Sequence, residues 1–111
     1  MIEGFERHSV VILNLVNPRE KFWGVLASLS AVGVTLRGIN LDSFEDWVRQ
    51  VAKGGDDQTL DLVTMFVPLF RLERIFLDEP VGSVQSYAEH FEQTVGVSVL
   101  TYLGIDQGEV S

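Results

Sequence analysis

The side chains able to bind a metal ion are few and scattered along this sequence. His8 lies in the N-terminal segment and His90 in a predicted helix, and neither has a second histidine or any cysteine at ligand spacing. Because a metal site needs three or four converging ligands, we interpret both as surface or packing residues. Asp56, Asp57 and Asp61 offer the oxygen ligands that Mg²⁺ or Ca²⁺ prefers, but they lack the alternating ligands and distal glutamate of a calcium loop. We therefore expect a solvated acidic loop, no metal and no cofactor.

Catalytic motifs are equally sparse. The sequence has no cysteine and shows no glycine-rich phosphate loop or Gly-x-Ser-x-Gly elbow. A carboxylate pair such as Glu73 and Asp78 leaves a small acid–base enzyme as one interpretation. Such pairs also arise by chance among many surface acids. We predict that the protein is not an enzyme and assign no catalytic residue.

Arg71 and Arg74 are the only basic residues in the second half of the chain. Residues 54–111 carry ten carboxylates against these two arginines, whereas residues 1–53 balance six basic and six acidic side chains, for a net charge of −8. A guanidinium group matches phosphate geometry, so the two arginines form a possible anion contact; pairing with nearby carboxylates is the interpretation we favour. Nucleic-acid binding gains most of its affinity from a clustered basic face, so this charge balance argues against RNA without excluding a small local patch.

Length and composition indicate one folded domain over residues 1–111. The chain is 46% hydrophobic and has only three prolines, which is typical of a globular protein. No apolar run approaches the roughly 18 residues of a membrane span, and residues 1–8 are acidic where a signal peptide would be basic and then apolar. We therefore expect no membrane association and a cytoplasmic location for an acidic protein.

Residues 10–41 and 63–77 are predicted to supply five strands. Residues 10–16 are a Val, Ile and Leu run broken only by Asn14, which is typical of a strand buried on much of both faces. Strands over 21–29 and 34–41 follow after short turns, and the isolated Gly24 in the first of these indicates a bend or a close backbone approach. Two more strands are predicted over 63–68 and 71–77. The first three should form an antiparallel meander.

Two helices are predicted between and after these strands. Over residues 43–53 the apolar side chains fall at helical spacing, with polar capping residues before them and Gly54 after them. Ser86 and Glu89 form a capping box that opens a second helix over residues 86–95. Residues 97–103 have the composition of a strand, without an assignable partner, and the residues after them are predicted to be a frayed tail.

The strand pattern resembles a family, the Sm-like proteins, and in particular their bacterial Hfq branch. The shared motif is an apolar residue two before a glycine, a branched one two after it and another three further on, here Phe22, Gly24, Leu26 and Leu29. The resemblance implies a small five-stranded antiparallel barrel of the Sm-like or SH3-like type, mainly β, with an inserted helix and a C-terminal helix. It covers some 60 to 70 residues.

The residues that bind RNA in that family have no counterparts here. Residues 30–33 read Ser-Ala-Val-Gly where the family has an aspartate and, in the Sm branch, an asparagine. Leu69 and Phe70 occupy the place of the family's Lys-His or Arg-Gly pair, and Arg37-Gly38 lies in another strand. The resemblance therefore implies the barrel without its usual RNA pocket.

The region around the fourth and fifth strands holds more large apolar side chains than a small barrel can bury. Exposed apolar strand edges are normally covered or paired, and the resemblance implies that subunits associate through these two strands. We therefore predict a self-associating, non-enzymatic interaction module, a homo-oligomer with a possible further protein partner; an RNA-binding Sm-like protein is the second interpretation. The predicted interface residues are Met65, Phe66, Val67, Leu69, Phe70 and Leu72.

Overall fold

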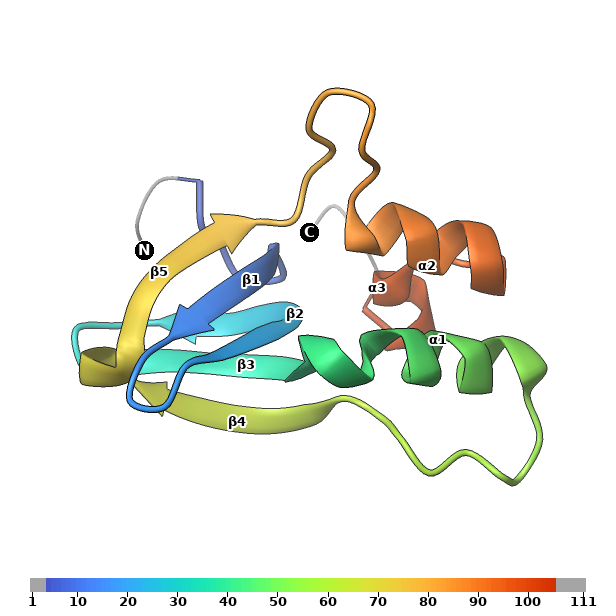
Figure 1. Cartoon of the computed structure of the whole chain (residues 1–111), viewed down its shortest axis with the longest axis horizontal. Coiled ribbons are helices and arrows are strands. Elements are labelled where there is room, and N and C mark those ends of the chain that lie inside the picture. Colours follow the sequence, from blue (N-terminus) through green and yellow to red (C-terminus); the bar gives the residue numbers. More distant parts are fainter. Residues whose placement is uncertain (1–3, 106–111) are drawn as a thin grey trace.

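A computed structural model describes residues 4–105 of the chain and contains five strands, three α-helices and two short 3-10 helices (Figure 1). The predicted C-terminal tail lies largely outside the described residues. The strands are β1 (Val10–Leu15), β2 (Glu20–Leu29), β3 (Gly33–Asn40), β4 (Val63–Pro68) and β5 (Leu72–Leu77). The helices are η1 (Leu41–Ser43), α1 (Phe44–Lys53), η2 (Leu69–Arg71), α2 (Tyr87–Val95) and α3 (Val99–Tyr102).

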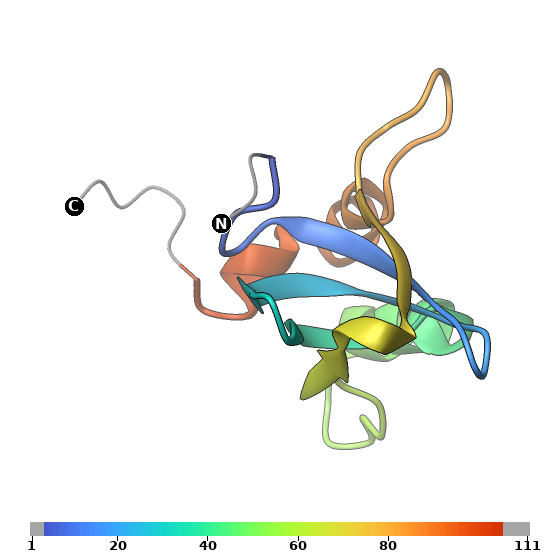
Figure 2. The same cartoon turned by 90° about the vertical axis from the view of Figure 1, so that its left-hand side faces the viewer.

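All five strands belong to one antiparallel sheet with the order β4-β3-β2-β1-β5. The first three form the predicted meander. The expected closed barrel is not confirmed, because β4 pairs with β3 and β5 with β1, and no ladder joins β4 to β5 in the described part of the chain. These two strands are linked only by the single turn of η2, and Figure 2 shows the sheet curled but open. The fold is therefore a mixed α/β domain built on an open, curled sheet.

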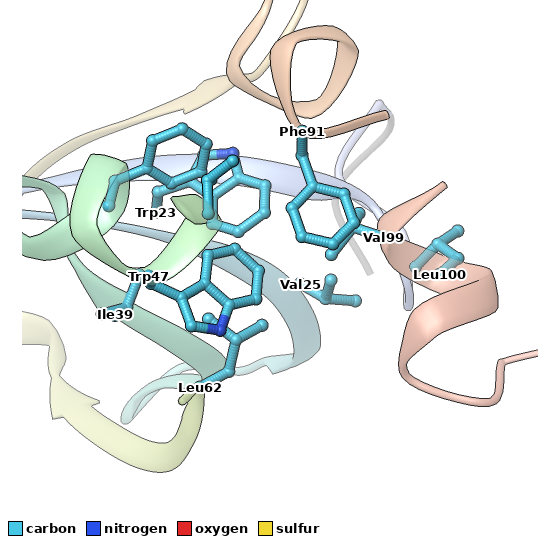
Figure 3. Packing of buried hydrophobic residues seen from close by; sticks show 10 residues of the cluster. Trp23, Val25, Ile39, Trp47, Leu62, Phe91, Val99 and Leu100 are labelled. Carbon is cyan, nitrogen blue, oxygen red and sulfur yellow. The ribbon is translucent and has the colours of Figure 1, made fainter. Parts of the chain in front are cut away.

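The two faces of the sheet bury separate apolar clusters. Alternate residues of β1, namely Val11, Leu13 and Leu15, point into the concave side of the curl. The opposite face carries Trp23 and Val25, against which the three α-helices pack (Figure 3). The strand β1 contributes apolar side chains to both clusters, which explains why residues 10–15 are apolar at nearly every position.

The helix-side cluster is dominated by aromatic rings. Trp47 of α1 stacks on Phe91 of α2 with ring centroids 4.9 Å apart, and Trp23 meets Phe44 edge-on at the same distance. All four side chains are almost wholly buried. Aromatic contacts of this geometry stabilise beyond the area that they bury, so this cluster fixes α1 and α2 on the sheet.

Residues 97–103 do not form the strand that their composition suggests. Ser98 caps a short helix, its side chain accepting a hydrogen bond from the Thr101 amide, and Val99 and Leu100 of α3 are buried in the helix-side cluster. Burial of these side chains in the helix-side cluster favours the helical turn, because a helix satisfies backbone groups within its own segment.

Gly24 marks a close approach between β2 and β3, as its isolated position predicts. It faces Gly38 across the ladder, and a Cβ atom at Gly24 would lie 2.3 Å from the Arg37 carbonyl oxygen and 2.5 Å from Gly38 Cα. Only a residue without a side chain fits between the two backbones here.

Candidate functional site

The two outer strands of the sheet present unpaired backbone edges. Within residues 4–105, β4 is bonded only along its β3 side and β5 only along its β1 side. An unpaired edge is a template for another strand unless it is covered or charged. Both edges therefore belong to the surface on which a partner would act.

Exposed apolar side chains surround the β4 edge, and we call these four residues the edge patch: Val32, Phe66, Leu69 and Phe70. Phe70 is 82% exposed at the turn of η2, and Phe66 is 55% exposed on β4. The Leu69 amide donates to the Val32 carbonyl oxygen at 3.0 Å, which ties the β2–β3 turn to η2. The ring of Phe66 lies over Gly33, where a Cβ atom would approach it to 2.6 Å. These contacts hold Leu69 and Phe66 against the β2–β3 turn that carries Val32.

The structure divides the predicted interface residues into two groups. Phe66, Leu69 and Phe70 are exposed, whereas Val67 is buried and Met65 and Leu72 pack against the concave-side cluster. Alternation along β4 turns neighbouring side chains to opposite faces, so a continuous apolar run is shared between core and surface. Val32, which the sequence prediction omits, joins the exposed group; its signal was an apolar residue at the tip of a tight turn.

A second group of exposed apolar side chains lies at the end of β5 and beyond it, and the sequence analysis did not predict the hairpin that carries part of it. The chain leaves β5 in a loop that projects from the body of the molecule and carries a small hairpin, in which Val81 and Val84 exchange backbone hydrogen bonds of 2.9 Å (Figure 1). These two valines are about 70% exposed. Phe76 and Leu77 at the end of β5 and Tyr87 at the start of α2 are also exposed, although Phe76 and Leu77 point to opposite faces of the sheet. Each open sheet edge is therefore bordered by exposed apolar side chains.

The Asp78 carboxylate links the sheet to α2. Its Oδ2 accepts hydrogen bonds from Trp23 Nε1 at 2.9 Å and from the Ala88 amide at 2.8 Å, and its Oδ1 accepts from the Tyr87 amide at 2.9 Å. A carboxylate at a helix N-terminus is stabilising because the amides there are unpaired and carry partial positive charge. These contacts give Asp78 a structural part in the fold.

Arg71 and Arg74 have different surroundings. The Arg71 guanidinium donates to the Val16 carbonyl oxygen at 2.6 Å and to Pro18 O and Glu20 Oε1, both at 2.9 Å, which clamps the β1–β2 turn against η2. The Arg74 guanidinium lies 5.9 Å from the centroid of the Phe76 ring. Arg71 thus has Nε and one terminal nitrogen of its guanidinium engaged within the chain, while Arg74 stands exposed on β5.

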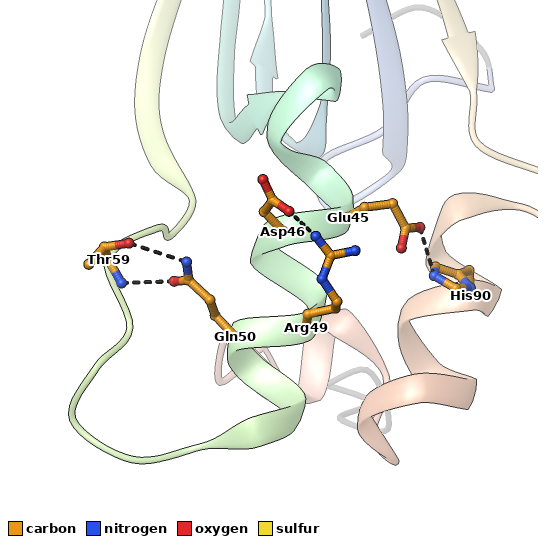
Figure 4. Close-up of polar contacts among 6 residues, drawn as sticks. All are labelled: Glu45, Asp46, Arg49, Gln50, Thr59 and His90. Atoms are coloured by element: carbon orange, nitrogen blue, oxygen red, sulfur yellow. Dashed lines mark hydrogen bonds and ion pairs between the residues drawn. The ribbon is translucent and has the colours of Figure 1, made fainter.

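The histidines and the acidic loop do not form a metal centre within residues 4–105. His90 Nε2 lies 2.8 Å from Glu45 Oε1 and so connects α2 to α1, while Gln50 of α1 holds the following loop through the Thr59 amide at 2.8 Å (Figure 4). His8 is exposed in the N-terminal segment. Across residues 4–105, no three histidine or carboxylate side chains come together as a possible metal site.

A polar recess of about 710 Å³ lies at the end of the sheet where β1 turns into β2 and β3 runs into η1. Its lining combines cationic, acidic and amide side chains with two leucines: Asn14, Leu15, Arg19, Glu20, Lys21, Asn40, Leu41, Asp42, Glu73 and Arg74. Three of the chain's eight basic residues meet there. With Glu20, Asp42 and Glu73 the lining also holds three carboxylates, so its formal charge is balanced, whereas the chain as a whole carries −8.

Asn14, the one polar residue in the apolar run of β1, is among the residues that line this recess. Its Oδ1 is buried and accepts no hydrogen bond. A buried polar group without a partner costs about 1–3 kcal/mol of stability, so its presence in a central strand needs a reason. Within the described residues, Trp47 Nε1 inside the aromatic core also lacks a hydrogen bond, and Trp47 does not line the recess.

Comparisons with protein-family models, with curated proteins and with solved structures find no match for the chain. None of the described helices is both long enough and apolar enough to cross a membrane.

Proposed function

We propose that this protein is a non-enzymatic interaction module that associates with copies of itself through the open edges of its sheet. The observation that carries the proposal is that β4 and β5 are both unpaired on their outer sides and are both bordered by exposed apolar side chains. Pairing one strand against the other in a neighbouring subunit would satisfy backbone groups and cover apolar surface in one step.

The edge patch supplies the hydrophobic part of this association. Burying a phenylalanine side chain contributes about 1.5–3 kcal/mol, and Phe70 is 82% exposed in the single chain. Phe66 and Leu69 extend the same surface. Aromatic anchors at the centre of an interface commonly carry most of its binding energy, which makes Phe70 the residue on which association should depend most.

We further propose that the fold is an open relative of the Sm-like and SH3-like barrels. The strand order β4-β3-β2-β1-β5, the single 3-10 turn between β4 and β5 and the glycine bend in β2 support this relationship. A neighbouring subunit at the open edges would continue the sheet in place of closure within one chain. The helix α1 then occupies the connection between β3 and β4.

Size-exclusion chromatography coupled to light scattering tests the self-association at micromolar concentration. We expect the full chain to elute at a multiple of 12.4 kDa. Phe70→Glu should weaken association about thirtyfold, because it removes some 2 kcal/mol of burial and places a charge in the contact. Val97→Glu is the matched control, since Val97 is also exposed but lies between α2 and α3, away from both sheet edges.

Two results would overturn the proposal. One is a monomer at every concentration at which the protein stays in solution. The other is an oligomer that Phe70→Glu leaves intact and Val97→Glu dissociates, which would place the interface on the helices.

A further inference from the structure

The polar recess at the β1–β2 end of the sheet presents an arranged row of side chains. Asn14 is the direct cross-strand partner of Lys21 on β2 and of Arg74 on β5. Directly opposed residues on neighbouring antiparallel strands project to the same face with their Cβ atoms roughly 5 Å apart. Lys21, Asn14 and Arg74 therefore form one row, with an amide between two cations.

This row lies on the helix-side face of the sheet, past the end of the helical cover. Two positions before Asn14 on the same face, Ile12 packs against the helix-side cluster. At Asn14 the apolar cover ends and the recess of about 710 Å³ begins. Asn14 lines the recess, and its buried Oδ1 lacks a donor; a group bound in the recess satisfies this acceptor once the amide turns toward it.

The free charges around the row define what fits. Glu20 is paired with Arg71 at 2.9 Å, which leaves Arg19, Lys21 and Arg74 as cations of the lining and Asp42 and Glu73 as carboxylates. No ion pair engages these five side chains within residues 4–105. The cations call for an anionic group on the ligand. The carboxylates and Asn14 Oδ1 accept hydrogen bonds and therefore call for hydroxyl donors.

We propose that this recess binds a small polyhydroxylated organic anion, with the anionic group between Lys21 and Arg74 and a neighbouring hydroxyl donating to Asn14 Oδ1. A hydroxyl suits the central position better than an ammonium group, because it would lie between two cations. Further hydroxyls meet Asp42 and Glu73 at the rim. A singly charged carboxylate fits these acidic neighbours better than a doubly charged phosphate, so a sugar acid is favoured over a sugar phosphate.

The site is independent of the self-association proposed above. Backbone pairing at the β5 edge leaves the side chains on the face of the sheet where they are. Loss of association in Phe70→Glu and loss of ligand binding are thus separate outcomes.

Titrations followed by amide NMR spectra of the full chain test the site with four probes. D-Gluconate carries both required features, D-glucose lacks the anion, hexanoate lacks the hydroxyls, and D-glucose 6-phosphate replaces the carboxylate by phosphate. We expect gluconate to bind with a Kd of about 1 mM, the affinity typical of a ligand of this size, and to shift resonances of Asn14, Lys21 and Arg74. Glucose 6-phosphate should bind more weakly, and glucose and hexanoate at least about tenfold more weakly.

Asn14→Leu tests whether the Asn14 side chain binds the ligand or is only an unfavourable residue that the strand tolerates. The leucine removes the unsatisfied oxygen, so the variant should melt at a higher temperature than the parent and yet bind gluconate at least about tenfold more weakly. Arg74→Gln should also weaken binding, and it keeps the test open if Asn14→Leu does not fold. Lys53→Gln, which changes an exposed cation outside the recess, should leave binding unchanged.

Three outcomes would refute the inference. The first is that gluconate and hexanoate bind alike, since this would reduce the effect to unspecific attraction of anions. The second is that Asn14→Leu or Arg74→Gln binds gluconate as the parent does. The third is that gluconate shifts no resonance of the recess at concentrations well above about 1 mM.

Discussion

Replacing Asp78 by alanine should destabilise the protein more than any other single change of a surface-accessible carboxylate. Asp78 stands directly after β5 and accepts hydrogen bonds from the Trp23 indole and from the first two amides of α2, at 2.8–2.9 Å. The Ser86 side chain accepts from the third amide, that of Glu89, at 3.0 Å. Asp78→Ala leaves the Ser86 cap in place. It removes the hydrogen bonds by which the Asp78 carboxylate joins the end of β5 to Trp23 and to the start of α2.

The loss of stability depends on which of the hydrogen-bond donors to Asp78 can bind water instead in the variant. The Tyr87 and Ala88 amides lie at the start of a helix, and losing a side-chain cap there costs about 1 kcal/mol. The Trp23 side chain is completely buried, so its indole N–H is left without a partner at a further cost of about 1–3 kcal/mol. We therefore expect Asp78→Ala to lower the free energy of unfolding by about 2–4 kcal/mol, which corresponds to a fall in Tm of about 9–17 °C.

Urea denaturation followed by tryptophan fluorescence and by far-UV circular dichroism measures this loss. Glu79→Ala is the matched control, because Glu79 is the adjacent exposed carboxylate, and it should change stability by less than about 0.5 kcal/mol. A double-mutant cycle of Asp78→Ala with Trp23→Phe isolates the indole contact and should give a coupling energy of about 1–2 kcal/mol. The reasoning is refuted if Asp78→Ala and Glu79→Ala are equally stable, or if the cycle shows no coupling.

Three further predictions address the bend in β2, the β1–β2 turn and nucleic acid. Gly24→Val should destabilise by about 2 kcal/mol or more, because a Cβ atom would lie 2.3 Å from the Arg37 carbonyl oxygen; a thermal melt within a degree or two of the parent would contradict the close approach. Arg71→Gln should cost about 1–2 kcal/mol in urea denaturation through its lost bonds to Val16 and Pro18, and an unchanged midpoint would mean that the turn does not need them. Fluorescence anisotropy with U-rich and A-rich oligomers at physiological salt should show no RNA affinity tighter than about 10 μM, given a net charge of −8; submicromolar, salt-sensitive binding would contradict this.

Local pattern alone predicted the secondary structure of the five strands and of the helices α1 and α2. The period-two and period-3.6 spacing of apolar residues depends only on neighbours in the chain, and so do the capping box at Ser86 and the stop at Gly54. The special place of Gly24 was also visible in the sequence, because an isolated glycine in a strand pattern marks a bend, a bulge or a close backbone approach. Residues 97–103 were the exception, because their secondary structure depended on the apolar cluster in which α3 is buried.

The tertiary structure decided which face of β4 is buried, and therefore which of the alternating interface residues reach the surface. Met65, Phe66 and Val67 are alike in the sequence, yet only Phe66 is largely exposed. Whether the sheet closes was likewise a tertiary matter, because β4 and β5 must meet in space for a ladder to form and the turn of η2 does not bring them into register. The exposed valines of the hairpin beyond β5 had no periodic signal at all.

The polar side chains show the same division between sequence and tertiary structure. Asn14 was identifiable in the sequence as an interruption of an apolar strand. Its neighbours Lys21 and Arg74 lie 7 and 60 positions further along the chain, on other strands. Only the register of the ladders places the three side chains in one row. Asp78 and Arg71 were ordinary charges in the sequence. Arg71 acquired its structural part from acceptors more than 50 positions away. Asp78 acquired its part from the Trp23 indole, 55 positions away, together with two amides of α2 that follow 9 and 10 positions later. Local spacing determines which elements form, whereas the pairing of distant strands determines which side chains meet.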